Sequence, residues 1–133
     1  MDSKSHLKLL VIAATALCIG CSSANGHQAP AHYPEQVLGV WEAGPDTCRL
    51  PGNLDSDTRI EIKPNKLVDY EQWNEPDVVE QISTKPKAWK IKSRLYIDEY
   101  LVDQEEIYIL TGSDDGALTI ADQSRSATYK RCR

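Results

Sequence analysis

The stretch AWKIKSRLYIDEYL, residues 88–101, alternates between apolar and polar side chains over most of its length. The apolar side chains on one parity are Trp89, Ile91, Leu95, Ile97 and Leu101, and the basic side chains on the other are Lys90, Lys92 and Arg94. Successive side chains of a β-strand point to opposite faces of the sheet. The stretch therefore predicts a half-buried strand with one apolar face and one basic face.

Shorter segments on both sides of this stretch also predict strands. They cover residues 37–41, 58–63, 67–72, 78–84, 107–110, 118–120 and 127–129. Residues 73–77 are expected to break the chain, and a short helix is the alternative at 78–82, where the alternation is weakest. The sequence SDDG at 113–116 is typical of a hairpin turn. Seven or eight short strands joined by turns predict an all-β fold, a small antiparallel meander that closes into a barrel or half-barrel.

The first 20 residues have the pattern of a bacterial signal peptide. Lys4 and Lys8 precede an uncharged apolar run at 9–20, which is too short to cross a bilayer as a permanent helix. Residues 21–36 are mostly small and polar and have no hydrophobic period, so we interpret them as a flexible tether. Residues 37–133 are expected to form one domain with one modest core.

The end of the signal, LCIGC at 17–21, resembles the lipobox of bacterial lipoproteins. In that family a small residue precedes the cysteine that is acylated, and Gly20 and Cys21 match this pattern. The resemblance implies a lipid anchor on Cys21, and Ser22 after it implies sorting to the periplasmic side of the outer membrane. Ordinary signal cleavage after Ala24 is the alternative.

Cysteine usage is compatible with either route of signal removal. The four cysteines are Cys18, Cys21, Cys48 and Cys132. Acylation of Cys21 and cleavage after Ala24 both leave Cys48 and Cys132 as the thiols of the folded domain. A pair of thiols in an oxidising compartment predicts an intramolecular disulfide, which here would tie the first strand to the last.

The charge of the chain excludes one class of partner. The formal net charge is −5, and loss of residues 1–20 would make the balance slightly more negative because it removes Lys4, Lys8 and Asp2. Binding to nucleic acid or to anionic lipid headgroups needs a net basic face. We therefore expect neither as a general partner.

The residues needed for catalysis are missing from the expected domain. The three histidines, His6, His27 and His32, all precede residue 37, which argues against Ser-His or Cys-His catalysis and against a histidine-built zinc site. No glycine-rich phosphate loop is present. Adjacent carboxylates on a strand point to opposite faces and do not converge. We expect no enzyme activity, no cofactor and no metal ion.

One face of the expected sheet has a distinctive composition, because the basic residues Lys90, Lys92 and Arg94 are followed on it by Tyr96 and Tyr100. The side chains expected to bind a partner are Trp73, Lys90, Lys92, Arg94, Tyr96 and Tyr100. Basic groups beside tyrosines suit an acidic protein or a glycan, through charge pairing and aromatic anchoring. The alternative is a solvated strand face with lysines that protect a sheet edge.

Two short motifs carry a second resemblance. Gly39-Val40-Trp41 followed by Cys48, and a final Tyr129-Lys130-Arg131-Cys132, resemble small lipocalin-like bacterial envelope proteins, which include periplasmic inhibitors of secreted metalloproteases. The resemblance implies a disulfide-bearing barrel that inhibits another protein. In those inhibitors, however, the disulfide does not tie the two ends of the chain, as a bond between Cys48 and Cys132 would do here.

These observations together favour a non-catalytic envelope lipoprotein that binds and neutralises a hydrolase, such as a toxin, a secreted protease or a lysozyme. A carrier of a small apolar ligand and a structural accessory of an envelope assembly are the alternatives. The barrel interior distinguishes the first two functions, because a carrier needs an apolar cavity of roughly a few hundred Å³.

Overall fold

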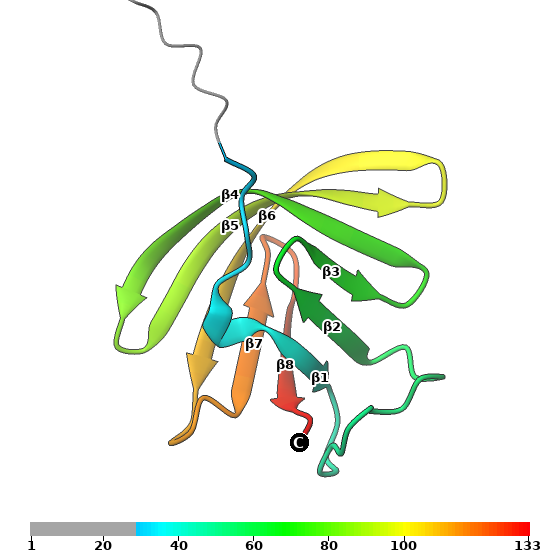
Figure 1. Cartoon of the computed structure of the whole chain (residues 1–133), viewed down its shortest axis with the longest axis vertical. Coiled ribbons are helices and arrows are strands. Elements are labelled where there is room, and N and C mark those ends of the chain that lie inside the picture. Colours follow the sequence, from blue (N-terminus) through cyan, green and yellow to red (C-terminus); the bar gives the residue numbers. More distant parts are fainter. Residues whose placement is uncertain (1–28) are drawn as a thin grey trace, which may run out of the picture.

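The computed structural model describes residues 29–133 and folds them into a closed, eight-stranded antiparallel barrel with one disulfide (Figure 1). The strands are β1 (Gly39–Glu42), β2 (Arg59–Lys63), β3 (Lys66–Asp69), β4 (Gln72–Thr84), β5 (Lys87–Ile97), β6 (Tyr100–Thr111), β7 (Ala117–Ala121) and β8 (Ser126–Arg131). A single 3-10 turn, η1 (Glu35–Val37), precedes β1. The expected all-β fold is confirmed, and the segment 78–82 is strand rather than helix.

Each strand pairs with its neighbour in sequence, and β1 closes the barrel against β8. The closing seam is short and contains two register pairs, Trp41 with Arg131 and Glu42 with Lys130. The disulfide between Cys48 and Cys132 lies beside this seam and spans 84 positions of the sequence. The predicted link between the first strand and the last is thus confirmed.

Large apolar side chains fill the interior of the barrel. The buried cluster consists of Tyr33, Val37, Trp41, Ile60, Ile62, Leu67, Trp89, Ile91, Tyr108, Leu110 and Leu118. Trp41 and Trp89 belong to the core, as we expected, and the Trp41 indole donates a hydrogen bond of 2.8 Å to the Val37 carbonyl. Interdigitated side chains of this size make the interior a packed core rather than a hollow.

The folded unit begins before residue 37, which corrects the expected end of the tether at residue 36. Tyr33 is buried and packs against Tyr108, with 6.0 Å between the ring centroids. Arg131 stacks on Trp41 and donates hydrogen bonds of 2.6 Å to the Gln36 carbonyl and 2.8 Å to the Leu38 carbonyl. These contacts dock the segment against the barrel, although its composition is polar.

The expected signal peptide, the acylation site Cys21 and the first part of the tether lie outside the described residues. Among residues 29–133, no helix is long and apolar enough to cross a membrane.

Two predictions about the strands were wrong. Residues 73–77 do not break the chain, because β4 continues through them for 13 residues and includes Pro76. The stretch 88–101 is not one strand, because β5 ends at Ile97 and β6 begins at Tyr100. Asp98 turns the chain with a φ of 50°, a left-handed conformation that aspartate tolerates better than most residues. The turn contains neither glycine nor proline, so the sequence gives little sign of it.

The longest strands extend past the barrel at its two ends. The β4–β5 hairpin projects at one end and the β5–β6 hairpin at the other (Figure 1). β3 pairs with β4 only at residues 72–74, and β7 pairs with β6 only from Ile107 onward. Within residues 29–133, the outer sides of residues 75–84 (the β4 edge) and residues 100–106 (the β6 edge) therefore have no strand neighbour.

Candidate functional site

The predicted basic stripe lies on β5, between two acidic strands that neutralise it. Lys90 and Lys92 are 3.7 and 3.5 Å from the Glu105 carboxylate on β6. Arg94 is 3.6 Å from Glu75 and 3.2 Å from Asp77, both on β4. The three basic side chains share the outer face as predicted, but their charges are matched within the sheet. The stripe is a ladder of ion pairs rather than an unpaired basic surface.

Two of the three aromatic residues expected to bind a partner, Trp73 and Tyr96, lie together on the outer face of the sheet. Trp73 and Tyr96 are cross-strand partners whose rings stack at 5.1 Å, with 8° between their planes. Leu101 is the register partner of Tyr96 on β6, so it continues the same outer row, and it is 56 % exposed. Trp73, Tyr96 and Leu101 therefore form one row on the outer face of the sheet.

Tyr100 does not belong to this row. The turn at 98–99 pairs it with Ile97, so its side chain shares the opposite parity of the sheet. It is 72 % exposed because the β5–β6 hairpin extends beyond the barrel. The prediction placed Tyr100 with Tyr96 because it treated residues 88–101 as one strand.

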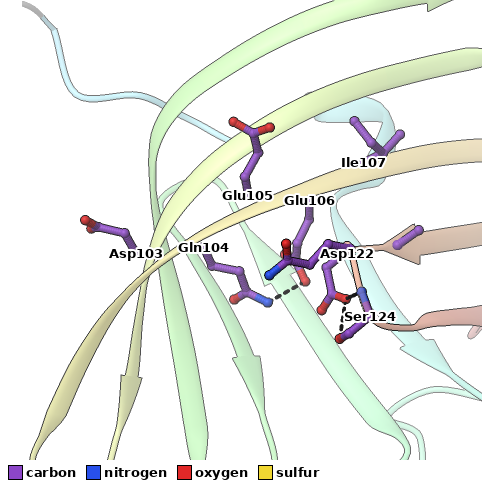
Figure 2. A pocket seen from close by; sticks show the side chains of 9 residues that line it. Asp103, Gln104, Glu105, Glu106, Ile107, Asp122 and Ser124 are labelled. Atoms are coloured by element: carbon purple, nitrogen blue, oxygen red, sulfur yellow. Dashed lines mark hydrogen bonds between the residues drawn. The ribbon is translucent and has the colours of Figure 1, made fainter.

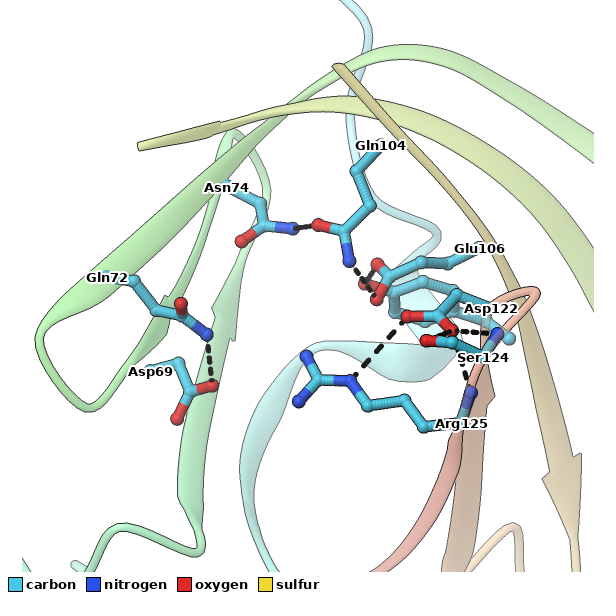
Figure 3. Close-up of polar contacts among 9 residues, drawn as sticks. Asp69, Gln72, Asn74, Gln104, Glu106, Asp122, Ser124 and Arg125 are labelled. Carbon is cyan, nitrogen blue, oxygen red and sulfur yellow. Dashed lines mark hydrogen bonds and ion pairs between the residues drawn. The ribbon is translucent and has the colours of Figure 1, made fainter. Parts of the chain in front are cut away.

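A polar cluster that we did not predict fills the barrel mouth, the end where β3 turns into β4 and β7 into β8 (Figure 3). Asn74 donates a hydrogen bond of 2.9 Å to the Gln104 side-chain carbonyl. The Gln104 amide in turn donates one of 2.9 Å to Glu106, and the Tyr108 hydroxyl donates one of 3.1 Å to the same carboxylate. This chain of hydrogen bonds satisfies polar groups at the top of the apolar core.

Two carboxyl groups at the mouth have pKa values shifted in opposite directions. Burial raises the pKa of Glu106, and the hydrogen bond from Tyr108 partly opposes this. The pKa of Asp122 is lowered to about 2, because the Ser124 hydroxyl and the backbone N–H groups of Ser124 and Arg125 all donate to its carboxylate. Glycoside hydrolases use a pair of carboxyl groups whose pKa values are shifted apart in this way. Here, hydrogen bonds within the chain engage both groups.

A groove of about 600 Å³ runs between the β6 edge and the turn that follows β7 (Figure 2). Its walls are residues 103–107 and residues 121–124. The carboxylates of Asp103, Glu105, Glu106 and Asp122 line it, and none of its lining residues is basic. The lining of the groove is therefore acidic, although two of its carboxylates have basic partners outside it: Lys90 and Lys92 pair with Glu105, and Arg125 is 3.6 Å from Asp122. A much smaller cavity of about 40 Å³ lies deeper in the mouth, among Asn74, Gln104 and Tyr129.

The groove and the mouth were missed because their residues carry no motif. The one available signal lay in the parity of β6, where Gln104 and Glu106 precede the core residues Tyr108 and Leu110 on the same face of the strand. Polar side chains on the core parity mark the point where a barrel strand leaves the apolar interior. That signal was not visible without the full extent of β6.

One group of possible metal ligands lies close together in the described part of the chain. It consists of Glu42, Cys48 and Cys132. Cys48 and Cys132 are bonded to each other, so neither offers the thiolate that binds a metal ion. The arrangement does not make a metal centre in the oxidised protein.

Comparison of the chain with protein-family models, with curated proteins and with solved structures finds no match. Function is therefore inferred from the residues and contacts above.

Proposed function

We propose that this protein is a non-catalytic lipoprotein of the bacterial envelope that binds a hydrolase and inhibits it. A lipid on Cys21 would anchor it to the periplasmic side of the outer membrane. The barrel would present the β3–β4 and β5–β6 hairpins to the partner.

The observation that carries the proposal is the set of exposed apolar side chains on these two hairpins, Tyr70, Trp73, Tyr100, Leu101 and Val102. Leu101 shares the outer face with Trp73, whereas Tyr100 and Val102 lie on the opposite parity of β6. Monomeric proteins rarely expose such groups together without a partner, and tyrosine and tryptophan are the residues most enriched at interface centres. The stacked Trp73 and Tyr96 rings form a preorganised anchor, which lowers the entropy cost of binding.

The packed interior supports a protein partner over a small ligand. The cavity in the mouth measures about 40 Å³, room for little more than one water molecule. A drug-sized apolar ligand needs a mostly apolar pocket of roughly 300 Å³ or more, and the groove of about 600 Å³ beside β6, which exceeds this volume, is lined largely by carboxylates and other polar side chains. The carrier alternative is thereby weakened.

The disulfide and the signal-like N-terminus support the envelope location. Structural disulfides persist mainly in exported proteins, because thiols are kept reduced in the cytosol. The bond between Cys48 and Cys132 agrees with an extracytoplasmic site, and Lys4, Lys8 and the apolar run at 9–20 supply the export signal.

The test is inhibition of purified enzymes by the purified full chain in detergent micelles. A panel contains a muramidase, a peptidoglycan amidase, a phospholipase and a secreted metalloprotease. We expect one enzyme to lose activity at equimolar concentration. Trp73→Ala should weaken inhibition about 30-fold or more, the effect of removing an interface anchor.

Ile82→Ser is the matched control, because Ile82 is exposed on β4 but lies near the opposite end of the strand. It should leave inhibition unchanged. Full activity of every enzyme in the panel, together with a lipid or other apolar molecule that copurifies with the protein, would favour the carrier instead.

A further inference from the structure

The β4 edge and the β6 edge both expose backbone groups, but only one is built for pairing. On β4, the register with β5 shifts between Pro76 and Val78 and again between Gln81 and Ser83. Proline has no N–H to donate, and bulges twist an edge away from a regular partner. These features are devices by which proteins protect an exposed edge. The β4 edge is a protected one.

The β6 edge has none of these devices. The register between β5 and β6 runs without a shift from Tyr100 to Leu110, and β6 contains neither proline nor glycine. Its residues 100–103 are exposed. A regular strand with one unpaired side is a template for an added strand.

The space beside the β6 edge is the acidic groove. The groove lies between residues 103–106 of β6 and the turn at 122–124, and β7 pairs with β6 only from Ile107 onward, so no strand of the described chain lies beside residues 103–106. Asp103 and Glu105 share one parity of β6 and point to the same side of it (Figure 2). Asp103 has no basic partner within 4.0 Å among residues 29–133.

We propose that the β6 edge binds an extended, basic segment of the protein partner as an additional strand. The inference rests on the proposed function in that this partner is the inhibited hydrolase. Backbone hydrogen bonds to residues 100–106 would supply affinity. Lysine or arginine at alternate positions of the segment would lie beside Asp103 and Glu105, because alternate side chains of a strand share a face.

A second copy of this chain is the less favourable occupant. Antiparallel pairing of two β6 edges would bring the carboxylates of Asp103 and Glu105 close to those of the other copy, and like charges across a strand pair repel. A basic partner would be attracted to these carboxylates, whereas a second copy would be repelled by them. The charge of the groove therefore selects between the two occupants.

The probe is a synthetic heptapeptide of alternating lysine and valine, added to the full chain in detergent micelles. Amide hydrogen exchange followed by NMR reports the position of binding. Alternate amides of residues 100–106 should become protected about tenfold or more on saturation, and amides of residues 75–84 should not change. Protection at the β4 edge, or at neither edge, would overturn the inference.

Two modified peptides separate strand pairing from charge attraction. In one the lysine amides are methylated, and in the other the valine amides are methylated, so both keep the charge of the probe. Only one set of alternate amides can face the β6 edge. One methylated peptide should lose binding at least tenfold and the other should keep it. Equal binding by both would show charge attraction alone and would refute strand addition.

Asp103→Lys should weaken the unmodified peptide about tenfold, because it replaces attraction by repulsion at the groove. Glu80→Lys is the matched control, since Glu80 is an exposed carboxylate on the β4 edge, and it should change affinity less than twofold. A dimer in sedimentation experiments that the peptide fails to dissociate would assign the edge to a second copy. If Asp103→Lys loses the peptide and still inhibits the hydrolase fully, strand addition fails and the proposed function stands.

Discussion

The β4 edge and the β6 edge lie on either side of β5 in the part of the barrel where only three strands are paired, yet they differ in how the unpaired side is built. β4 carries Pro76 and two register shifts, while β6 is regular along its whole pairing with β5. β5 lies between them and is paired on both sides. The contrast shows that the two open edges differ in backbone regularity and in charge. One edge is closed by backbone irregularity, and the other is left available and bordered by carboxylates.

The largest expected effect tests whether this contrast is local. The double substitution Cys48→Ser and Cys132→Ser should lower the free energy of unfolding by about 4–5 kcal/mol, because it frees a long loop in the unfolded chain. Urea denaturation measures the loss. Amides at the β6 edge should stay fast in exchange and those paired within β5 should stay the slowest. A selective change at one of the two edges would show that the disulfide controls the contrast.

A smaller effect is expected at the point where β6 passes from open to paired. Tyr108→Phe leaves one oxygen of the buried Glu106 without its donor, which should cost about 1–3 kcal/mol. Tyr129→Phe is the control, because no hydrogen bond of the Tyr129 hydroxyl to residues 29–133 is found, and it should cost less than about 0.5 kcal/mol.

The cost of Tyr108→Phe should depend on pH. Burial raises the folded-state pKa of Glu106 above its usual 4.5, so this group's contribution to stability is greatest below pH 4.5 and falls as the pH rises through the folded value. Loss of the Tyr108 hydrogen bond, which lowers that pKa, should raise it further. The cost of Tyr108→Phe in urea denaturation should therefore be larger at pH 7 than at pH 4. A larger cost at pH 4 would contradict the conclusion that the folded-state pKa of Glu106 is raised and that the Tyr108 hydrogen bond opposes this.

Pro76→Thr tests the β4 edge directly. It should cost about 0.4–1 kcal/mol, because the unfolded chain gains freedom. It should also allow the lysine–valine peptide to bind at residues 75–84, with lower affinity than at the β6 edge. Peptide titration followed by NMR would detect this binding. Unchanged exclusion of the peptide from β4 would show that the register shifts alone protect this edge.

The smallest effect concerns the ion-pair ladder. Lys92→Glu should cost about 0.2–1 kcal/mol in low salt and less in 1 M NaCl, since exposed pairs contribute little and are screened. It should also tighten binding of the basic peptide a few-fold, because it removes one of the two cations paired with Glu105. Lys85→Glu, in the turn between β4 and β5, should change neither quantity. Weaker peptide binding by Lys92→Glu would contradict the acidic-groove assignment.

The sequence predicted what depends on burial and missed what depends on register. Alternation around Trp89 and Ile91 indicated the sheet, because those side chains face the core on one parity. Residues 102–106 carry polar groups on both parities since the hairpin leaves the core there, so the first half of β6 had no periodic signal. Pro76 suggested a break, yet an unpaired edge accepts proline without losing a hydrogen bond.

The candidate site followed the same rule. Exposure of Lys92 and Arg94 could be predicted from parity, but their neutralisation requires the register with Glu75 and Glu105, which sequence alone does not supply. Glu106 and Asp122 meet at the groove only because β6 and β7 pair next to them, from Ile107 and Ala121 onward. Neighbourhood across strands is a property of the closed barrel, and no local pattern encodes it.

The short seam between β1 and β8 has a mechanical consequence. A pull on the residues before Tyr33 reaches the barrel first at Tyr33, which packs on Tyr108 and whose backbone N–H donates a hydrogen bond of 2.7 Å to the Pro64 carbonyl. It then reaches Arg131, which bonds the Gln36 and Leu38 carbonyls, and then the two register pairs of the seam. The Cys48–Cys132 bond follows the seam along the chain, so a pull that separates those pairs next meets a covalent link to the end of β8. If the proposed lipid anchor holds the N-terminus, a partner at the β6 edge would pull against it through this link.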